Sequence, residues 1–118
     1  MELSAKLQIK PGTQVSVLAA PSDGPDLSGL GPPTADLATA GAVIAFARQS
    51  ADISGVARPA IEAARDDRLA WVAYPKAGQL GTDLNRDTLA STVAALGVRP
   101  VRQVSLDDVW SALRLRPA

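Results

Sequence analysis

Two residue types that carry much of enzyme chemistry are missing from this chain of 118 residues. There is no cysteine, which excludes disulfides, thiolate nucleophiles and thiolate metal sites. There is no histidine either, which excludes Ser-His and Cys-His pairings, most zinc sites and the usual general base near neutral pH. Any catalysis would therefore rest on carboxylates, Lys, Arg, Tyr or a bound cofactor.

Net charge and aromatic side chains are also scarce. Twelve basic and twelve acidic residues cancel, and aromatic residues make up 3% of the chain. No global charge attracts nucleic acid or a membrane, so neither is an expected partner, and near-zero charge favours self-association, for instance as a homodimer. The first residues lack the apolar core of a signal peptide, and no apolar run approaches the ~18–20 residues of a membrane span. We expect a cytoplasmic protein.

What the chain does contain is enough apolar residues for one core. The hydrophobic fraction is 47% and the charged fraction 20%, which is typical of a folded globular protein. At this length we expect a single domain over residues 1–118.

Three short apolar runs, at residues 15–20, 42–47 and 69–74, predict the central strands. None alternates with polar residues, so each strand would be covered on both faces, as in a parallel sheet flanked by helices. More than the dozen residues that a parallel crossover needs separate each run from the next.

Two helices are expected between and after these runs. Apolar residues recur at helical spacing over 53–64, where Pro59 predicts a kink or a restart. A second helix is expected from about 84 to 96, capped by Thr82 or Asp83. Its buried face would consist of Leu89, Val93 and Leu96. A left-handed turn at Gly97 would end it.

The remaining segments complete the expected architecture. The last residues predict an antiparallel hairpin, in which 98–106 pairs with the alternating strand around 113–116 across a turn at 107–109. A short helix is expected around 3–7. Residues 20–40 are crowded with Pro and Gly, which leaves room for one helical turn near 26–30 and predicts either a surface connection or a mobile flap over the sheet edge. The predicted fold class is α/β: a small three-layer Rossmann-like sheet with central parallel strands and a C-terminal antiparallel hairpin.

The residues Ile9-Lys10-Pro11-Gly12 before the first expected strand resemble the same region of class I methyltransferases. In that family an acidic residue and a Gly-rich loop after the strand hold S-adenosylmethionine. Residues 16–22 of this chain contain neither an acidic residue nor paired glycines, and Pro21 removes a backbone donor. The resemblance therefore implies the fold and not the Gly-rich cofactor loop.

A second resemblance extends over nearly the whole chain. It rests on Ile9-Lys10-Pro11-Gly12 with Ala20-Pro21, on residues 71–76 with 82–87, and on Arg99-Pro100-Val101 with residues 107–114. These pieces are similar to a family of small bacterial proteins of unknown function. The resemblance implies a Rossmann-like fold and brings no established reaction; residues 25–40 are shorter here than in that family.

Ligands of open α/β sheets bind at the carboxyl ends of the strands, where Tyr74-Pro75-Lys76 should lie. Lys76, Arg86 and the free N–H groups of the following helix would together bind an anionic group such as a phosphate or carboxylate. In the alternative interpretation the same polar residues only cap the helix, form ion pairs or face solvent. The candidate ligand-binding residues are Tyr74, Lys76, Thr82, Asn85 and Arg86.

Other polar and aromatic residues admit more than one interpretation each. Asp107-Asp108 is a metal-binding pair, a carboxylate dyad or, as we favour, a turn former. Trp71 and Trp110 are expected to pack in or near the core rather than to stack on a base. Four arginines of the hairpin form either a basic patch for a nucleic acid or an acidic partner, or an exposed face that protects a sheet edge: Arg99, Arg102, Arg114 and Arg116.

Two functions fit these expectations, and no catalytic residue or cofactor is assigned in either. The first is a non-catalytic module that binds a protein partner or a small anionic ligand at the carboxyl edge of the sheet. The second is a degenerate methyltransferase-like or nucleotide-binding enzyme that uses the same edge, near Ala20-Pro21 and Lys76. The missing His, Cys and Gly-rich loop favour the first.

Overall fold

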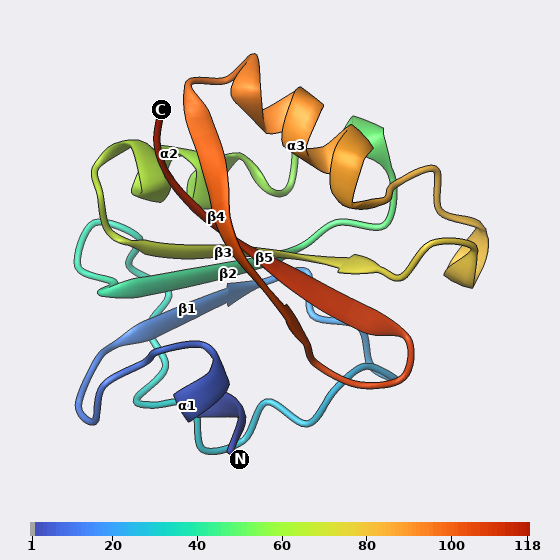
Figure 1. The fold of residues 1–118 in the computed structure, drawn as a ribbon. Helices are drawn as coiled ribbons and strands as arrows, with labels where there is room; N and C mark the ends of the chain where they lie inside the picture. The colour runs from blue at the N-terminus through green and yellow to red at the C-terminus, as the bar shows by residue number, and fades with distance from the viewer. Residues whose placement is uncertain (1) are drawn as a thin grey trace.

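A computed structural model describes residues 2–118, and a five-stranded mixed sheet forms its centre (Figure 1). The strands lie in the order β1-β2-β3-β5-β4, so the last strand of the chain lies inside the sheet, between β3 and β4. The first three are parallel, and β5 is antiparallel to both of its neighbours. Their bounds are β1 Val15–Leu18, β2 Ala42–Phe46, β3 Leu69–Pro75, β4 Val98–Ser105 and β5 Trp110–Pro117. The predicted α/β class, the central parallel strands and the C-terminal hairpin are confirmed.

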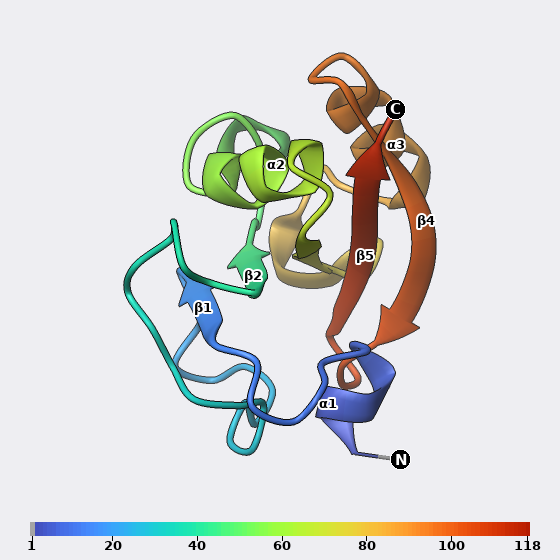
Figure 2. The same ribbon diagram turned by 90° about the vertical axis from the view of Figure 1, so that its left-hand side faces the viewer.

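Two helices cover one side of the sheet, which we call the helix face (Figure 2). They are α2 (Arg58–Arg65) and α3 (Arg86–Ala94). Their buried side chains, among them Ile61 and Leu89, share one apolar cluster with Val72 of β3 and with Leu113 of β5. Each helix is the crossover out of a parallel strand, so both pack on the same side.

The opposite side, the N-terminal face, has a different cover. The short helix α1 (Leu3–Lys6) and the segment after it bring Leu7 against Trp71 and Trp110. The Trp71 indole N–H donates to the Leu7 carbonyl at 3.0 Å, and Trp110 packs edge-on against Phe46 with ring centroids 5.2 Å apart. Both tryptophans are buried, which confirms their predicted packing role, and the N-terminal helix is confirmed as well.

Pro59 marks a new start rather than a kink. The helix α2 begins at Arg58, so that Pro59 stands in its first turn, where its missing N–H costs nothing. The apolar residues at 53–57 form turns that still bury Ile53, and the short 3-10 turn η1 (Ser50–Asp52) precedes them. The predicted restart is confirmed, although helical spacing alone had suggested one longer element.

The predicted cap of α3 is wrong. The helix starts after Asn85, whose side-chain oxygen accepts from the Thr88 N–H at 2.9 Å, while the Thr88 hydroxyl accepts from the Asn85 N–H at 2.9 Å. Thr82 and Asp83 lie upstream in the loop and bond to the segment after β2. Gly97 does adopt the expected left-handed conformation, with φ +86°, a conformation open to glycine because it has no Cβ.

The Pro- and Gly-rich segment contains no helical turn at 26–30, contrary to prediction. The Asp26 carboxylate accepts from the Ser28 N–H at 3.0 Å, and Gly29 turns left-handed with φ +80°, which diverts the backbone from a helix. The segment then runs beside β1, where the Val15 N–H donates to the Pro32 carbonyl at 2.9 Å.

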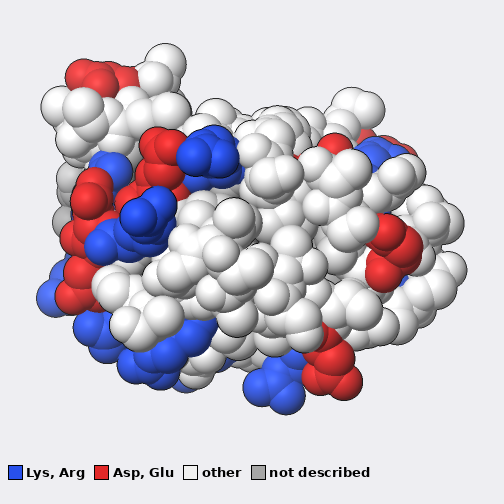
Figure 3. All heavy atoms as spheres, turned by 90° about the horizontal axis from the view of Figure 1, so that it is seen from above, with Lys and Arg blue, Asp and Glu red and all other residues white. Residues whose placement is uncertain are grey.

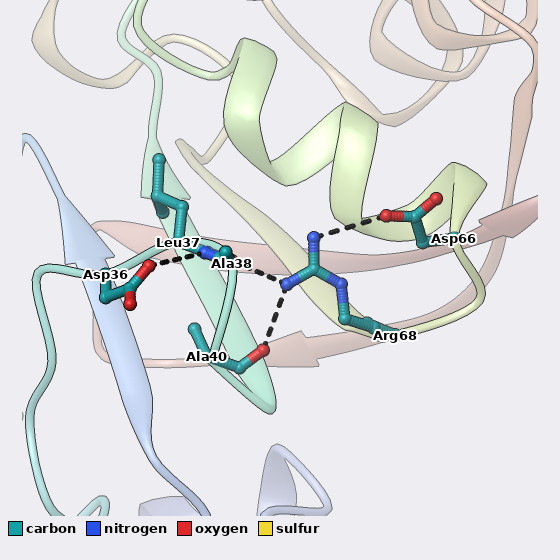
Figure 4. A network of polar contacts seen from close by, with 6 residues as sticks. All are labelled: Asp36, Leu37, Ala38, Ala40, Asp66 and Arg68. Atoms are coloured by element: carbon teal, nitrogen blue, oxygen red, sulfur yellow. Dashed lines mark hydrogen bonds and ion pairs between the residues drawn. The ribbon is translucent and has the colours of Figure 1, made fainter.

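Arg68 anchors the end of this segment (Figure 4). One guanidinium nitrogen of Arg68 donates to the carbonyls of Leu37 and Ala40, at 2.7 and 3.1 Å, and the other lies 3.4 Å from the Asp66 carboxylate. The Ala38 N–H is held in turn by Asp36 at 3.0 Å. Because these bonds tie residues 36–40 to the residue before β3, the segment is a surface connection there.

Candidate functional site

The loops that follow β2 and β3 are joined to each other. The Asp83 carboxylate accepts from the Ser50 N–H at 2.8 Å and from the Ser50 hydroxyl at 2.6 Å, and the Thr82 hydroxyl donates to the Arg48 carbonyl. The hydroxyl and then the N–H of Ser50 hold the pKa of Asp83 below its ordinary value. These hydrogen bonds connect the two loops, and those from Ser50 satisfy the Asp83 carboxylate.

Tyr74 starts a row of polar side chains on the helix face. Ser111 of β5 pairs in register with both Tyr74 and Ser105, so the three side chains point to the same side of the sheet. Gln103 precedes Ser105 by two residues on β4 and shares that side. The row crosses three strands where β3 ends.

The hydroxyl of Tyr74 is buried and makes no hydrogen bond within residues 2–118. The side chain of Gln103 lies near enough to lower the pKa of this hydroxyl, although the two groups do not meet at the distance and angle of a hydrogen bond. Burial raises the pKa of Tyr74 above its ordinary value, against the weaker opposing effect of the nearby Arg86. At neutral pH the group is therefore a protonated donor that has nothing to donate to.

Lys76 extends from the end of β3 toward the hairpin. Its ammonium donates to the Ser105 hydroxyl at 3.0 Å, and the Ser105 hydroxyl donates to the Asp107 carbonyl at 3.1 Å. From the other face Lys6 reaches the Ser105 carbonyl at 3.3 Å. Within residues 2–118, neither Lys76 nor Arg86 forms an ion pair with a carboxylate.

The structure brings three of the five candidate residues to this place and separates two. Tyr74 lies at the end of β3 and Lys76 directly follows the strand, while the charge of Arg86 at the start of α3 affects the pKa of Tyr74. Thr82 faces the loop after β2, and Asn85 is used as the helix cap. We call the group that comes together the carboxyl-edge cluster; it consists of Tyr74, Lys76, Arg86, Gln103 and Ser105.

Gln103 and Ser105 were missed because their place depends on how β4 pairs with β5. Both lie in a strand with weak hydrophobic alternation, where nothing in the sequence marks them, and the register changes along that strand. The one signal in the sequence was the expected C-terminal hairpin, which had to pair beside the strand that contains Tyr74.

The acidic turn of the hairpin has a structural role, as favoured. One oxygen of the Asp107 carboxylate accepts from the N–H groups of Val109 and Trp110, at 2.8 and 2.7 Å. In the part of the chain that the structure describes, no group of three His, Cys, Asp or Glu side chains could hold a metal ion. None of the helices described there has both the length and the apolar character needed to cross a bilayer.

Comparison with known proteins leaves the site to be interpreted from its own geometry. No protein-family model matches the sequence. No curated protein matches it either. The resemblance to a family of small bacterial proteins therefore stays a prediction.

Proposed function

We propose that the protein is a non-catalytic binding module that holds an anionic group, such as a phosphate or a carboxylate, at the carboxyl-edge cluster. The observation that carries the proposal is the Tyr74 hydroxyl, a buried donor without an acceptor, two residues before Lys76 and near enough to Arg86 for that charge to affect its pKa. Neither cation is neutralised by a carboxylate of the described chain.

The energetics favour an added acceptor. Leaving a buried polar group without a partner costs about 1–3 kcal/mol, and an oxyanion next to Tyr74 would remove that cost. Lys76 and Arg86 would each supply a charge-assisted bond, stronger than a bond between neutral groups. Asp83 does not compete, because Ser50 occupies its carboxylate. Asp87, exposed in the first turn of α3, weakens the attraction and favours a ligand with several acceptor oxygens.

The finer fold assignment belongs to the same proposal. We infer a reduced Rossmann-like domain, supported by three parallel strands, by two helices on one face and by a shorter cover on the other. The turn after β1 supports a role without a dinucleotide cofactor, because Ala19, Ala20 and Pro21 stand where a Gly-rich loop would offer N–H groups. A cytoplasmic location and self-association as a homodimer complete this proposal.

One observation favours a second candidate, an enzyme or former enzyme with a nucleotide-like cofactor. The reversed strand β5 lies between β3 and β4, an arrangement that suits a methyltransferase-like sheet. Its cofactor would lie near Ala20-Pro21 and Lys76, at the same edge.

A thermal-shift series separates the two candidates. Phosphate at one hundred times its dissociation constant should add about 2.7 kcal/mol to the free energy of unfolding. Lys76→Gln and Arg86→Gln should each remove most of the shift. Arg58→Gln, which removes a distant exposed arginine of α2, serves as the matched control and should keep it.

The remaining outcomes decide against the proposal. A phosphate shift of equal size in wild type, Lys76→Gln and Arg86→Gln would mean that the anion binds elsewhere. Stabilisation by S-adenosylmethionine or a nucleotide, with none by phosphate, would favour the enzyme candidate.

A further inference from the structure

A β-bulge in β4 changes which side of the sheet its residues face. Val98 and Val104 are six residues apart and would point to the same side of a regular strand. Val98 instead packs in the helix-face core, whereas Val104 packs against the N-terminal-face core. The pairing with β5 shifts between Pro100 and Arg102, which leaves Val101 as the extra, exposed residue.

The bulge places four arginines on one surface. Arg99 pairs in register with Arg116, and Arg102 pairs with Arg114. Arg114 also pairs with Trp71, which packs in the N-terminal-face core, so all four point to the N-terminal face. Without the bulge, Arg99 and Arg102 would point to opposite faces. We call this two-by-two group the arginine array.

Two members of the array are held in fixed orientation. One Arg114 nitrogen donates to the Gln8 side-chain oxygen at 2.6 Å, and Arg116 forms an ion pair with Asp67 at 3.1 Å. Gln8 and Asp67 both have left-handed backbone conformations, with φ of +61° and +58°, which are costly for residues other than glycine. The two residues that fix these guanidinium groups therefore both have an unfavourable backbone conformation.

The other two members, Arg99 and Arg102, are exposed and have no side-chain hydrogen bond or ion pair in the described chain. Like charges opposite each other on neighbouring strands destabilise a sheet. Only Arg116 faces a carboxylate, and the Nε atom of Arg114 is buried without a partner. Folding alone does not explain this arrangement, because it works against stability.

We propose that the arginine array binds an acidic segment of a partner protein. Residues two apart on a strand are spaced by about 6.6–6.8 Å, so Arg114 and Arg116 have the spacing of carboxylates at alternate positions of an extended peptide. Arg99 and Arg102, which lie opposite them on β4 and have no carboxylate partner, would bind such carboxylates directly. A guanidinium binds a carboxylate through two parallel hydrogen bonds. A groove of about 390 Å³ continues from Arg114 and adds Lys10 and the Thr13 hydroxyl to the surface.

The surroundings favour a protein over a nucleic acid. Acidic residues lie close by, among them Asp66 and Asp67, and Figure 3 shows basic and acidic side chains gathered together toward one end of the molecule. These carboxylates confine the positive surface to the array itself, which suits a short acidic segment better than a long polyanion that would extend past them. Trp71, the aromatic residue behind the array, is fully buried and offers no surface for base stacking.

The partner should lie on the face and not along the edge. β4 is the last strand of the sheet, but Pro100 lacks an N–H and the bulge at Val101 distorts the edge, and both features oppose strand addition. The surface shares no residue with the carboxyl-edge cluster, so the two proposals can fail separately.

Fluorescence anisotropy with a labelled peptide of alternating Glu and Ser tests the proposal at low salt. We expect Arg99→Gln combined with Arg102→Gln to weaken binding about tenfold, the loss of two charge-assisted contacts. Arg58→Gln combined with Arg65→Gln removes the same charge from α2 and should leave the affinity within about twofold. Circular dichroism checks that both variants remain folded.

Three results would overturn the proposal. One is an equal loss in both double variants, which would indicate an effect of net charge alone. Another is tighter binding of a single-stranded oligodeoxythymidylate at the same salt, which would assign the surface to nucleic acid. The third is no peptide binding at low ionic strength.

Discussion

At the scale of single residues, two buried donors have no hydrogen-bond partner within residues 2–118: the Tyr74 hydroxyl and the Nε atom of Arg114. Buried polar groups in native proteins are nearly always bonded, so each one calls for an explanation. The first belongs to the carboxyl-edge cluster and the second to the arginine array. Both proposed surfaces therefore coincide with a group that folding leaves unsatisfied.

Tyr74 is the single tyrosine of the chain, so its titration can be followed without interference. Burial raises its pKa above the ordinary value of 10.0, and we expect the phenolate absorbance of the folded protein to appear at a higher pH than in urea. Between the unfolded and the folded pKa the native state binds more protons, so the free energy of unfolding should fall as the pH rises above 10.0. Urea unfolding at several alkaline pH values measures this fall.

Tyr74→Phe is the control, because it keeps the ring and removes the titrating group. The variant should lose the part of the alkaline destabilisation that Tyr74 causes. A normal titration midpoint in the folded protein would contradict the burial of this hydroxyl.

At the scale of elements, the strands were predictable and the caps were not. Continuous apolar runs at 15–20, 42–47 and 69–74 are removed from water when they form strands of a sheet that is covered on both sides. By contrast Thr82, Asp83 and Asn85 are all good cap residues. The choice among them depends on Ser50 and Arg48, more than thirty positions earlier in the chain, and local sequence carries no information about those contacts.

The observed cap of α3 makes a specific prediction. Asn85→Ala should lower the free energy of unfolding by about 1 kcal/mol, because the Thr88 N–H loses its acceptor. Amide exchange at Thr88 should speed up in this variant. Asp83→Ala should instead speed exchange at Ser50 and leave Thr88 protected. Faster exchange at Thr88 in the Asp83 variant would indicate that Asp83 contributes to the cap, as the sequence had suggested.

The candidate site was likewise predictable in part. Tyr74, Lys76 and Arg86 follow from the rule that ligands bind where parallel strands end. Gln103, Ser105 and the shared face of the arginines depend on a one-residue bulge at Val101, which reverses every side chain on one side of it. Hydrophobic alternation in β4 is weak, so its register could not be derived from the sequence.

At the scale of the whole molecule, one sheet is shared by two cores. Alternate residues of β3, such as Trp71 and Val72, pack into the N-terminal-face core and the helix-face core respectively. The two covers are unequal, since one consists of two helices and the other of a four-residue helix and irregular segments. The central strands therefore pack into both cores, and each core stabilises the strands on which the other depends.

This sharing predicts that the two cores unfold together. Leu7 and Leu89 are both fully buried, one in each core, and Leu7→Ala and Leu89→Ala should each cost about 2–5 kcal/mol. Both tryptophans lie in the N-terminal-face core, so fluorescence reports that half, while far-ultraviolet circular dichroism reports the helices. In both variants the two signals should change at the same urea concentration. If Leu7→Ala moved the fluorescence transition alone, the N-terminal cover would unfold independently, and the arginine array on that face would have to be assembled by its partner rather than preformed.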